Sequence, residues 1–131
     1  MASETYHEDE SALSPETKDL HRAISSLMEE LEAVDWYQQR VDATSDAELG
    51  AILAHNRDEE IEHAMMVLEW IRRRRPSFDE HARTYLFSNG PIVDVEARAT
   101  QGENPGLEPG DAEARKTIDD SGCLGIGSLR K

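Results

Sequence analysis

A glutamate and a histidine three residues apart, Glu60 and His63, have a spacing that suggests metal chemistry. A helix advances about 100° per residue, so both side chains fall on one broad face of a helix. On the same helical wheel, five apolar residues lie within about 40° of Glu60. They are Leu49, Leu53, Ala64, Val67 and Ile71. A carboxylate within an apolar stripe is costly unless it has a proton, a cationic partner or a metal.

The preceding helical segment offers a second carboxylate, Glu30, at the edge of its own apolar stripe. Tyr37 lies seven residues later, on nearly the same line. A Glu-x-x-His with a Glu from a neighbouring helix is the di-metal pattern of four-helix bundles. Carboxylates can bridge two cations, and imidazole suits iron. A full set needs four Glu and two His, so this chain supplies half, and the pattern predicts that two copies form one site.

Simpler readings of the same residues remain open. Glu-x-x-His arises by chance in helices as charged as these. Glu60 could pair with Arg57, one turn earlier, in place of a metal. His63 alone could be an ordinary surface or core histidine.

Two long helices are needed to position these residues. Ser14 and Pro15 are typical of a helix start, and apolar spacing continues the first helix to about residue 42. After a break at 43–46, Thr44 or Ser45 is expected to cap a second helix that reaches Arg74, before Pro76 stops it. A loop this short predicts an antiparallel hairpin.

The rest of the chain is less regular. A short helix is expected from residue 77 to 85 or 87, a turn at 89–91, and a further helical turn or two at 92–98. We therefore expect a helical hairpin domain at 14–98 and a flexible acidic arm at 1–13. Residues 99–122 have the composition of a disordered linker, and 123–131 form an apolar tail. The predicted fold is all-α, dimerising into a ferritin-like four-helix bundle.

Composition narrows the classes of function. Only 37% of the 131 residues are hydrophobic, so either part of the chain is unfolded or a second subunit completes the core. A net charge of -14 disfavours nucleic acid and anionic membranes, and it either attracts divalent cations or simply aids solubility. The single cysteine, Cys123, excludes a disulfide within the chain. Neither a signal peptide nor a membrane span is evident, so we expect a cytoplasmic protein.

Three segments together resemble the encapsulated ferritin family: 28–37 (MEELEAVDWY), 54–63 (AHNRDEEIEH) and 83–87 (RTYLF). The tail, Leu124 to Leu129, resembles the peptide that loads cargo into encapsulin shells. The resemblance implies a ferroxidase whose di-iron centre forms across a dimer interface, within a ring that is typically a homodecamer. Its iron ligands would be Glu30, Glu60 and His63 from each chain, with Tyr37 close by as a catalytic residue.

The same resemblance implies two further metal sites. Glu29 and Glu32 would form a site that draws cations in, although the residues alone favour an ordinary solvated helix face. His55, Glu59 and Glu62 would form a weaker secondary site at a subunit contact. Oxygen-rich ligation there suits calcium, and surface charge is again the simpler reading.

The expected function is oxidation of Fe(II) by O2 for iron storage inside an encapsulin nanocompartment. One alternative is a non-catalytic cargo protein that binds divalent metal. Another is a scaffold that only oligomerises and docks. Oxygen consumption on adding ferrous iron and the iron stoichiometry distinguish these alternatives.

Overall fold

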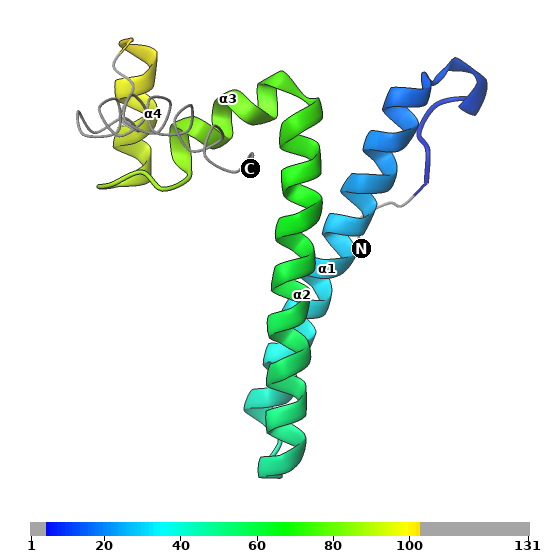
Figure 1. The fold of residues 1–131 in the computed structure, drawn as a ribbon, viewed down its shortest axis with the longest axis vertical. Coiled ribbons are helices and arrows are strands. Elements are labelled where there is room, and N and C mark those ends of the chain that lie inside the picture. Colours follow the sequence, from blue (N-terminus) through cyan, green and yellow to red (C-terminus); the bar gives the residue numbers. More distant parts are fainter. Residues whose placement is uncertain (1–4, 103–131) are drawn as a thin grey trace, which may run out of the picture. The chain divides into compact units, whose positions relative to one another are not determined.

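The computed structural model describes residues 5–102, and this part of the chain is all helical, as predicted. A 3₁₀ turn, η1 (Glu10–Ala12), precedes four α-helices (Figure 1). These are α1 (Pro15–Ala43), α2 (Ala47–Arg74), α3 (Pro76–Tyr85) and α4 (Ile92–Thr100). The chain divides into two units, one ending at Phe78 and one beginning at Asp79. No helix within 5–102 is both long and apolar enough to cross a membrane.

The start of α1 confirms the predicted cap. The Ser14 hydroxyl oxygen accepts the backbone N–H of Thr17 at 3.1 Å, and Pro15 occupies the first helical position. Ser14 also donates to the Thr17 hydroxyl at 3.0 Å. Thr17 therefore fills the position where a Glu or Gln usually completes a capping box.

The cap of α2 differs from the prediction. Asp46, rather than Thr44 or Ser45, caps the helix, and its carboxylate accepts the backbone N–H of Leu49 at 2.8 Å. A carboxylate at this position also interacts favourably with the positive end of the helix dipole. Thr44 instead terminates α1, and its hydroxyl accepts the backbone N–H of Asp46 at 3.2 Å.

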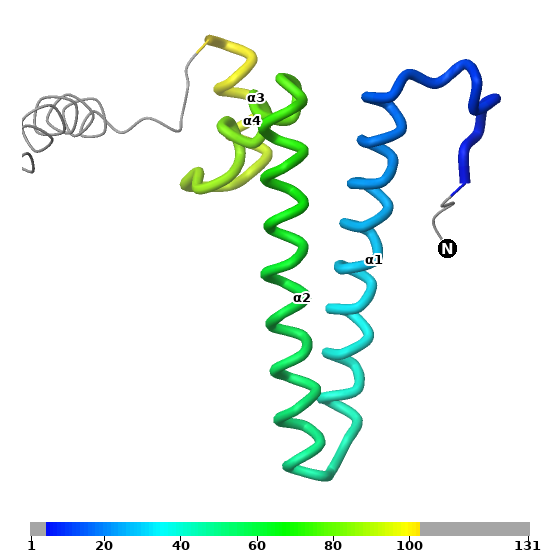
Figure 2. The backbone as a smooth tube through the Cα atoms, turned by 45° about the vertical axis from the view of Figure 1, so that its right-hand side comes forward, coloured from blue at the N-terminus to red at the C-terminus, as the bar shows by residue number. Residues whose placement is uncertain are grey.

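The two long helices form the predicted antiparallel hairpin. Figures 1 and 2 show α1 and α2 side by side near the short connection at 44–46 that joins them, and in Figure 1 the two helices diverge toward the other end of the hairpin. Ala64 and Ile71 of α2 are fully buried. Many other large apolar side chains on both helices remain partly exposed, so a single hairpin encloses little core.

Residues 5–13, part of the expected arm, have defined local structure beside α1. The rings of Tyr6 and His21 have centroids 4.8 Å apart. The Lys18 ammonium lies 3.5 Å from a Glu10 carboxylate oxygen. Both contacts join this segment to the first turns of α1.

The unit that begins at Asp79 contains most of α3 and all of α4. Between them the backbone takes a left-handed conformation at Phe87, with φ of 62°, and at Gly90, with φ of 84°. The chain bends at Gly90, within the predicted turn at 89–91, but the hydrogen-bonded turn lies earlier, where the Ser88 N–H donates to the Tyr85 carbonyl at 3.3 Å. Pro91 precedes the first residue of α4. α4 ends at Thr100, two residues beyond the expected domain boundary at 98. The tail and nearly all of the expected linker, from residue 103 onward, lie outside the described residues.

Candidate metal centre

Three side chains from two helices converge near the middle of the hairpin. Glu30 comes from α1, and Glu60 and His63 come from α2. Each offers a ligand atom, and these atoms all lie within 4.8 Å of one another. The Nδ1 atom of His63 is 3.2 Å from Oε2 of Glu60 and 3.9 Å from Oε2 of Glu30. Among residues 5–102 this is the one group of three His, Cys, Asp or Glu residues close enough to hold a metal ion.

The fold explains this convergence. Residues three apart on a helix are surface neighbours, so α2 holds Glu60 next to His63 without any tertiary contact. Only the antiparallel return of the chain can bring Glu30 to the same place. The sequence predicted these three ligands, and the structure brings all three together.

The two carboxylates share a hydrogen bond, which shifts their pKa values in opposite directions. The pKa of Glu30 is raised, chiefly by this hydrogen bond, with loss of hydration and the negative charge of Glu60 adding to it. The pKa of Glu60 is lowered, chiefly by the same hydrogen bond and further by the one with His63. When the pair carries one proton, Glu30 is therefore the partner that holds it and Glu60 is the acceptor.

The cluster is open on one side. The Glu30 and Glu60 side chains are 26% and 25% exposed, and the His63 side chain is 52% exposed. The helical wheel places Glu60 in the middle of the apolar stripe, where its charge is expected to be costly. A single hairpin leaves it a quarter exposed, because part of that stripe is uncovered.

The alternative reading of the sequence required Arg57 to pair with Glu60, but the described contacts of Arg57 are made with other residues. Its Nε and Nη2 atoms both donate to Oδ1 of Asp58, at 2.9 and 2.8 Å. Its Nη1 atom donates to Oε1 of Gln38 on α1 at 2.6 Å. The described contacts of the guanidinium thus lead away from the cluster, which leaves a shared proton or a bound cation as the partner of these carboxylates.

The other predicted site residues are less closely grouped. His55 Nε2 lies 3.0 Å from Oε1 of Glu59, so this pair is in contact. Glu62 does not join them in a group of three ligand atoms, nor do Glu29 and Glu32 belong to one. All five side chains lie on exposed parts of the helices.

Tyr37 is partly buried on α1, two turns beyond Glu30. The Arg40 guanidinium lies over its ring, 5.5 Å from the ring centroid. Sequence reasoning missed Gln38, the neighbouring residue, which carries the hydrogen bond across to α2. A Gln on a charged helix gives no signal of this kind until the register of the two helices is known.

A Glu on one helix and a Glu-x-x-His on the other match half of the ligand pattern of ferritin-like carboxylate bundles. The comparison with protein families agrees. A profile of the EncFtn-like family matches residues 5–89, and the chain belongs to this family.

Relatives of known description support the assignment along most of the chain. The chain is 58% identical to the encapsulated ferritin-like protein of Rhodospirillum rubrum, over 99% of this chain and 91% of that protein. It is 52% identical to a ferritin-like protein of Thermotoga maritima, over 85% of this chain and 96% of that one. It is 35% identical to the encapsulin nanocompartment cargo protein EncC of Myxococcus xanthus, over 86% of each.

A solved structure has the same fold. The crystal structure of protein ne0167 from Nitrosomonas europaea superposes with a TM-score of 0.65 and 65% sequence identity. The match covers 67% of this chain and 97% of that chain. The family, the relatives and the fold thus agree with the resemblance found in the sequence.

Proposed function

We propose that this protein is a ferroxidase that binds Fe(II) as its substrate and oxidises it with O2 to Fe(III). The observation that carries the proposal is the convergence of Glu30, Glu60 and His63, with ligand atoms within 4.8 Å of one another. Two carboxylates and an imidazole make a mixed oxygen and nitrogen donor set, which suits ferrous iron. The residues present therefore fit the substrate.

A second copy of the chain would complete the site. Di-iron bundles use a Glu from each of two helices and a Glu-x-x-His from each of two others, so α1 and α2 provide half. The second hairpin would add its ligands from the open side of the cluster, where the His63 side chain is 52% exposed. A two-fold related hairpin would bring the same three residues and give about one iron per chain.

Exposed apolar side chains flank this opening on α2. With Glu60 at zero on a helical wheel, Leu49, Ile52, His63 and Met66 lie between about -20° and -120°. Leu49, Ile52 and Met66 are 46%, 53% and 64% exposed. Clustered apolar exposure of this kind marks a surface that packs against another protein. A second hairpin would cover this surface while completing the metal site. A core shared between two chains also accounts for the low hydrophobic content of the sequence.

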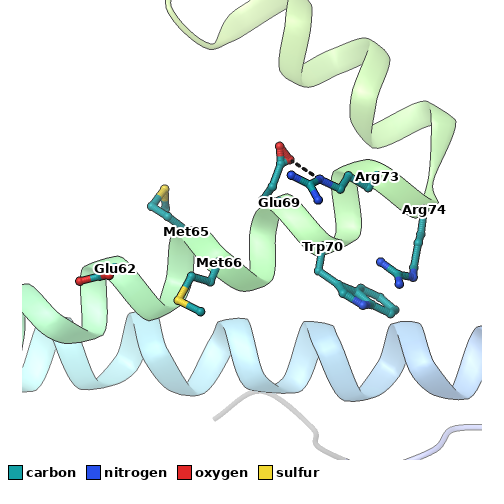
Figure 3. Close-up of a pocket in the computed structure, with 7 residues that line it drawn as sticks. All are labelled: Glu62, Met65, Met66, Glu69, Trp70, Arg73 and Arg74. Atoms are coloured by element: carbon teal, nitrogen blue, oxygen red, sulfur yellow. Dashed lines mark ion pairs between the residues drawn. The ribbon is translucent and has the colours of Figure 1, made fainter. Parts of the chain in front are cut away.

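The apolar surface continues along α2 into a hollow of about 510 Å³ (Figure 3). Figure 3 shows Met66 and Trp70 on the side of α2 toward α1, while Met65 and Glu69 point the other way. A second hollow of about 430 Å³ is lined by Met66 and Trp70 and also by Ala23 of α1. The surface available to a partner hairpin therefore extends across both helices.

In the proposed reaction each Fe(II) loses one electron, and O2 is the acceptor. A pair of ions supplies two electrons, enough to convert one O2 and two protons to hydrogen peroxide, and four ions carry the reduction to water. Glu60, ionised through its lowered pKa, would meet the incoming cation first. Any proton that the pair shares, held by Glu30 because its pKa is raised, would leave when the cation binds. Tyr37 would lie beside the centre, two turns along α1.

We further propose accessory roles for the outlying acidic residues. Glu29 and Glu32, both exposed on α1, would gather cations from solvent. His55, Glu59 and Glu62 would form a secondary site at a subunit contact and would take calcium, a cation that prefers oxygen ligands. Of these, the contact between His55 and Glu59 at 3.0 Å is the one geometric support.

The likeness to proteins described as encapsulated and as encapsulin cargo supports a location inside an encapsulin shell in the cytoplasm. Segment 124–129 would bind the shell, and dimers would assemble into a decameric ring. There the oxidised iron would be stored.

Oxygen consumption after anaerobic loading with Fe(II) tests the proposal. A ferroxidase consumes O2 in proportion to added iron, with a rate that depends on Glu60. A protein that only sequesters metal binds Fe(II) without accelerating O2 uptake, and a scaffold binds none.

A further inference from the structure

We infer that the hydrogen bond from Arg57 to Gln38 sets the register of α1 against α2 and thereby positions the metal ligands. The inference rests on the proposed metal site and adds two positioning residues to it. Neither residue belongs to the Glu-x-x-His pattern, and neither offers a ligand atom to the cluster.

The contact crosses from one helix to the other between two well-held side chains. Arg57 Nη1 donates to Oε1 of Gln38 at 2.6 Å, and the bond is partly buried. On α2, the other edge of the guanidinium, formed by Nε and Nη2, donates two hydrogen bonds to Asp58 Oδ1. On α1, the Gln38 amide donates from Nε2 to Oδ1 of Asp42 at 2.9 Å. Each partner is therefore anchored to its own helix before it reaches across.

The same helix register accounts for this bond and for the metal cluster. Gln38 lies eight residues beyond Glu30 on α1, and Arg57 lies six residues before His63 on α2. In an antiparallel pair these two steps run in the same direction, about 12 Å and about 9 Å along the axis. The remaining 3 Å or so is within the reach of an arginine side chain. A shift of one helix along the other therefore changes both contacts together.

Register matters because metal ligands tolerate little displacement. Distances in a metal site must be correct to about 0.2 Å. A slip of one residue between the helices moves a side chain by about 1.5 Å along the axis. Apolar contacts are non-directional, and this hairpin buries few apolar side chains completely, so apolar packing resists such a slip less firmly here. A short hydrogen bond to a guanidinium is directional, so it holds the register where apolar packing does not.

A role of Arg57 through its charge and a role in positioning predict opposite changes in metal affinity when Arg57 is replaced. The arginine lies one turn before Glu60, so its positive charge alone would weaken cation binding. Replacing it with Met would then strengthen binding, and the freed Asp58 carboxylate would add to that effect. If Arg57 acts by positioning, the same replacement weakens binding. The direction of the change therefore distinguishes the two.

Titration of the full-length protein with Co(II), followed by its visible absorption bands, tests the inference. These bands report the coordination geometry as well as the affinity. Gln38→Met and Arg57→Met should each weaken Co(II) binding by about tenfold or more and alter the bands, as loss of a residue that orients metal ligands does. Gln38→Glu keeps an acceptor for Arg57 and should restore both affinity and spectrum.

A matched control is Arg83→Met. Arg83 donates to Asp79 at 3.0 Å within α3, and neither residue lines the hollows on α1 and α2. This variant should bind Co(II) like the wild type. Circular dichroism checks that each variant is folded, and if Arg57→Met does not fold, the charge-neutral Gln38→Met decides.

Two results would overturn the inference: wild-type affinity and bands in Gln38→Met, or binding as weak in Gln38→Glu as in Gln38→Met. Failure of the wild type to bind Co(II) is a different result, because it would refute the proposed metal site itself.

Discussion

The Nδ1 atom of His63 lies 3.9 Å from Oε2 of Glu30, although α2 carries the histidine and α1 the glutamate. Glu60 reaches His63 through helical spacing alone, whereas Glu30 reaches it only because the chain turns back at 44–46. Folding of the hairpin and assembly of the ligand set are thus one event. Changes to the ligands, to the flanking surface and to the tail should have separable effects.

Replacement of Glu60 should separate activity from stability. Glu60→Ala removes a proposed iron ligand and should lower the initial rate of Fe(II) oxidation by about 100-fold or more. The metal-free protein should keep its fold but lose a little stability, because Glu30 and His63 lose the carboxylate that they hydrogen-bond. Stopped-flow absorbance and thermal unfolding measure the two effects.

The control for that variant is Glu48→Ala, which removes a carboxylate from the first turn of the same helix. It should leave oxidation unchanged and destabilise the protein slightly, because an acidic residue near a helix N-terminus is favourable. Wild-type oxidation in Glu60→Ala would show that the ligand assignment is wrong.

The shared proton should give the metal-free protein a distinctive pH dependence. The pKa of Glu30 is raised, so its contribution to stability is present below the unfolded-state pKa and lost as pH rises through the folded-state pKa. The pKa of Glu60 is lowered, so its contribution is present above the unfolded-state pKa and lost as pH falls through the folded-state pKa.

Glu30→Gln keeps a neutral donor to Glu60 at every pH. The variant should therefore gain stability relative to the wild type as pH rises above the ordinary glutamate range, about 4 to 5. Thermal unfolding of chelator-treated protein across a pH series measures this difference. Parallel curves for the two proteins would argue against proton sharing.

Local signals in the sequence predicted most of the hairpin. Ser14, Pro15 and Pro76 mark helix boundaries through backbone chemistry that holds in almost any context. The predicted caps of α2, Thr44 and Ser45, lie two residues and one residue before the observed cap, Asp46. All three are good capping residues, so the sequence does not decide between them. The choice depends on how the chain leaves α1, which local sequence does not encode.

The grouping of Glu30, Glu60 and His63 could be predicted because a carboxylate is costly within the apolar stripe where the helical period places Glu60. The hydrogen bond between Arg57 and Gln38 could not, since both types are ordinary on a charged helix. The wheel also overestimated the burial of Glu60. It showed which face is apolar, but not that part of that face would stay exposed in one chain.

The exposed apolar face beside His63 should be needed for both assembly and activity. Ile52 is 53% exposed on this face, and Ile52→Glu would place a charge where the partner hairpin packs. We expect loss of dimers and about a 100-fold loss of oxidation rate, with the helical content of the monomer retained. Size-exclusion chromatography with light scattering gives the oligomeric state.

Ala51→Glu adds the same charge at an adjacent exposed residue, about 180° from Glu60 on the helical wheel. It should dimerise and oxidise iron like the wild type. Equal behaviour of the two variants would mean that the second hairpin packs elsewhere.

The tail should affect packaging alone. The sequence there places Leu124, Ile126 and Leu129 among small residues, a pattern suited to a short peptide that binds a hydrophobic groove. Deletion of 124–131 should leave ring formation and oxidation unchanged and abolish packaging on co-expression with an encapsulin shell protein. Recovery of the truncated protein inside intact shells at wild-type yield would refute this role.

The central claim is that an active site requires two chains, and native mass spectrometry after anaerobic Fe(II) loading tests it most directly. We predict that iron-loaded species contain an even number of chains with about one iron per chain, and that only these species consume O2 when it is admitted. A monomer that binds iron and oxidises it at the full rate would contradict the account.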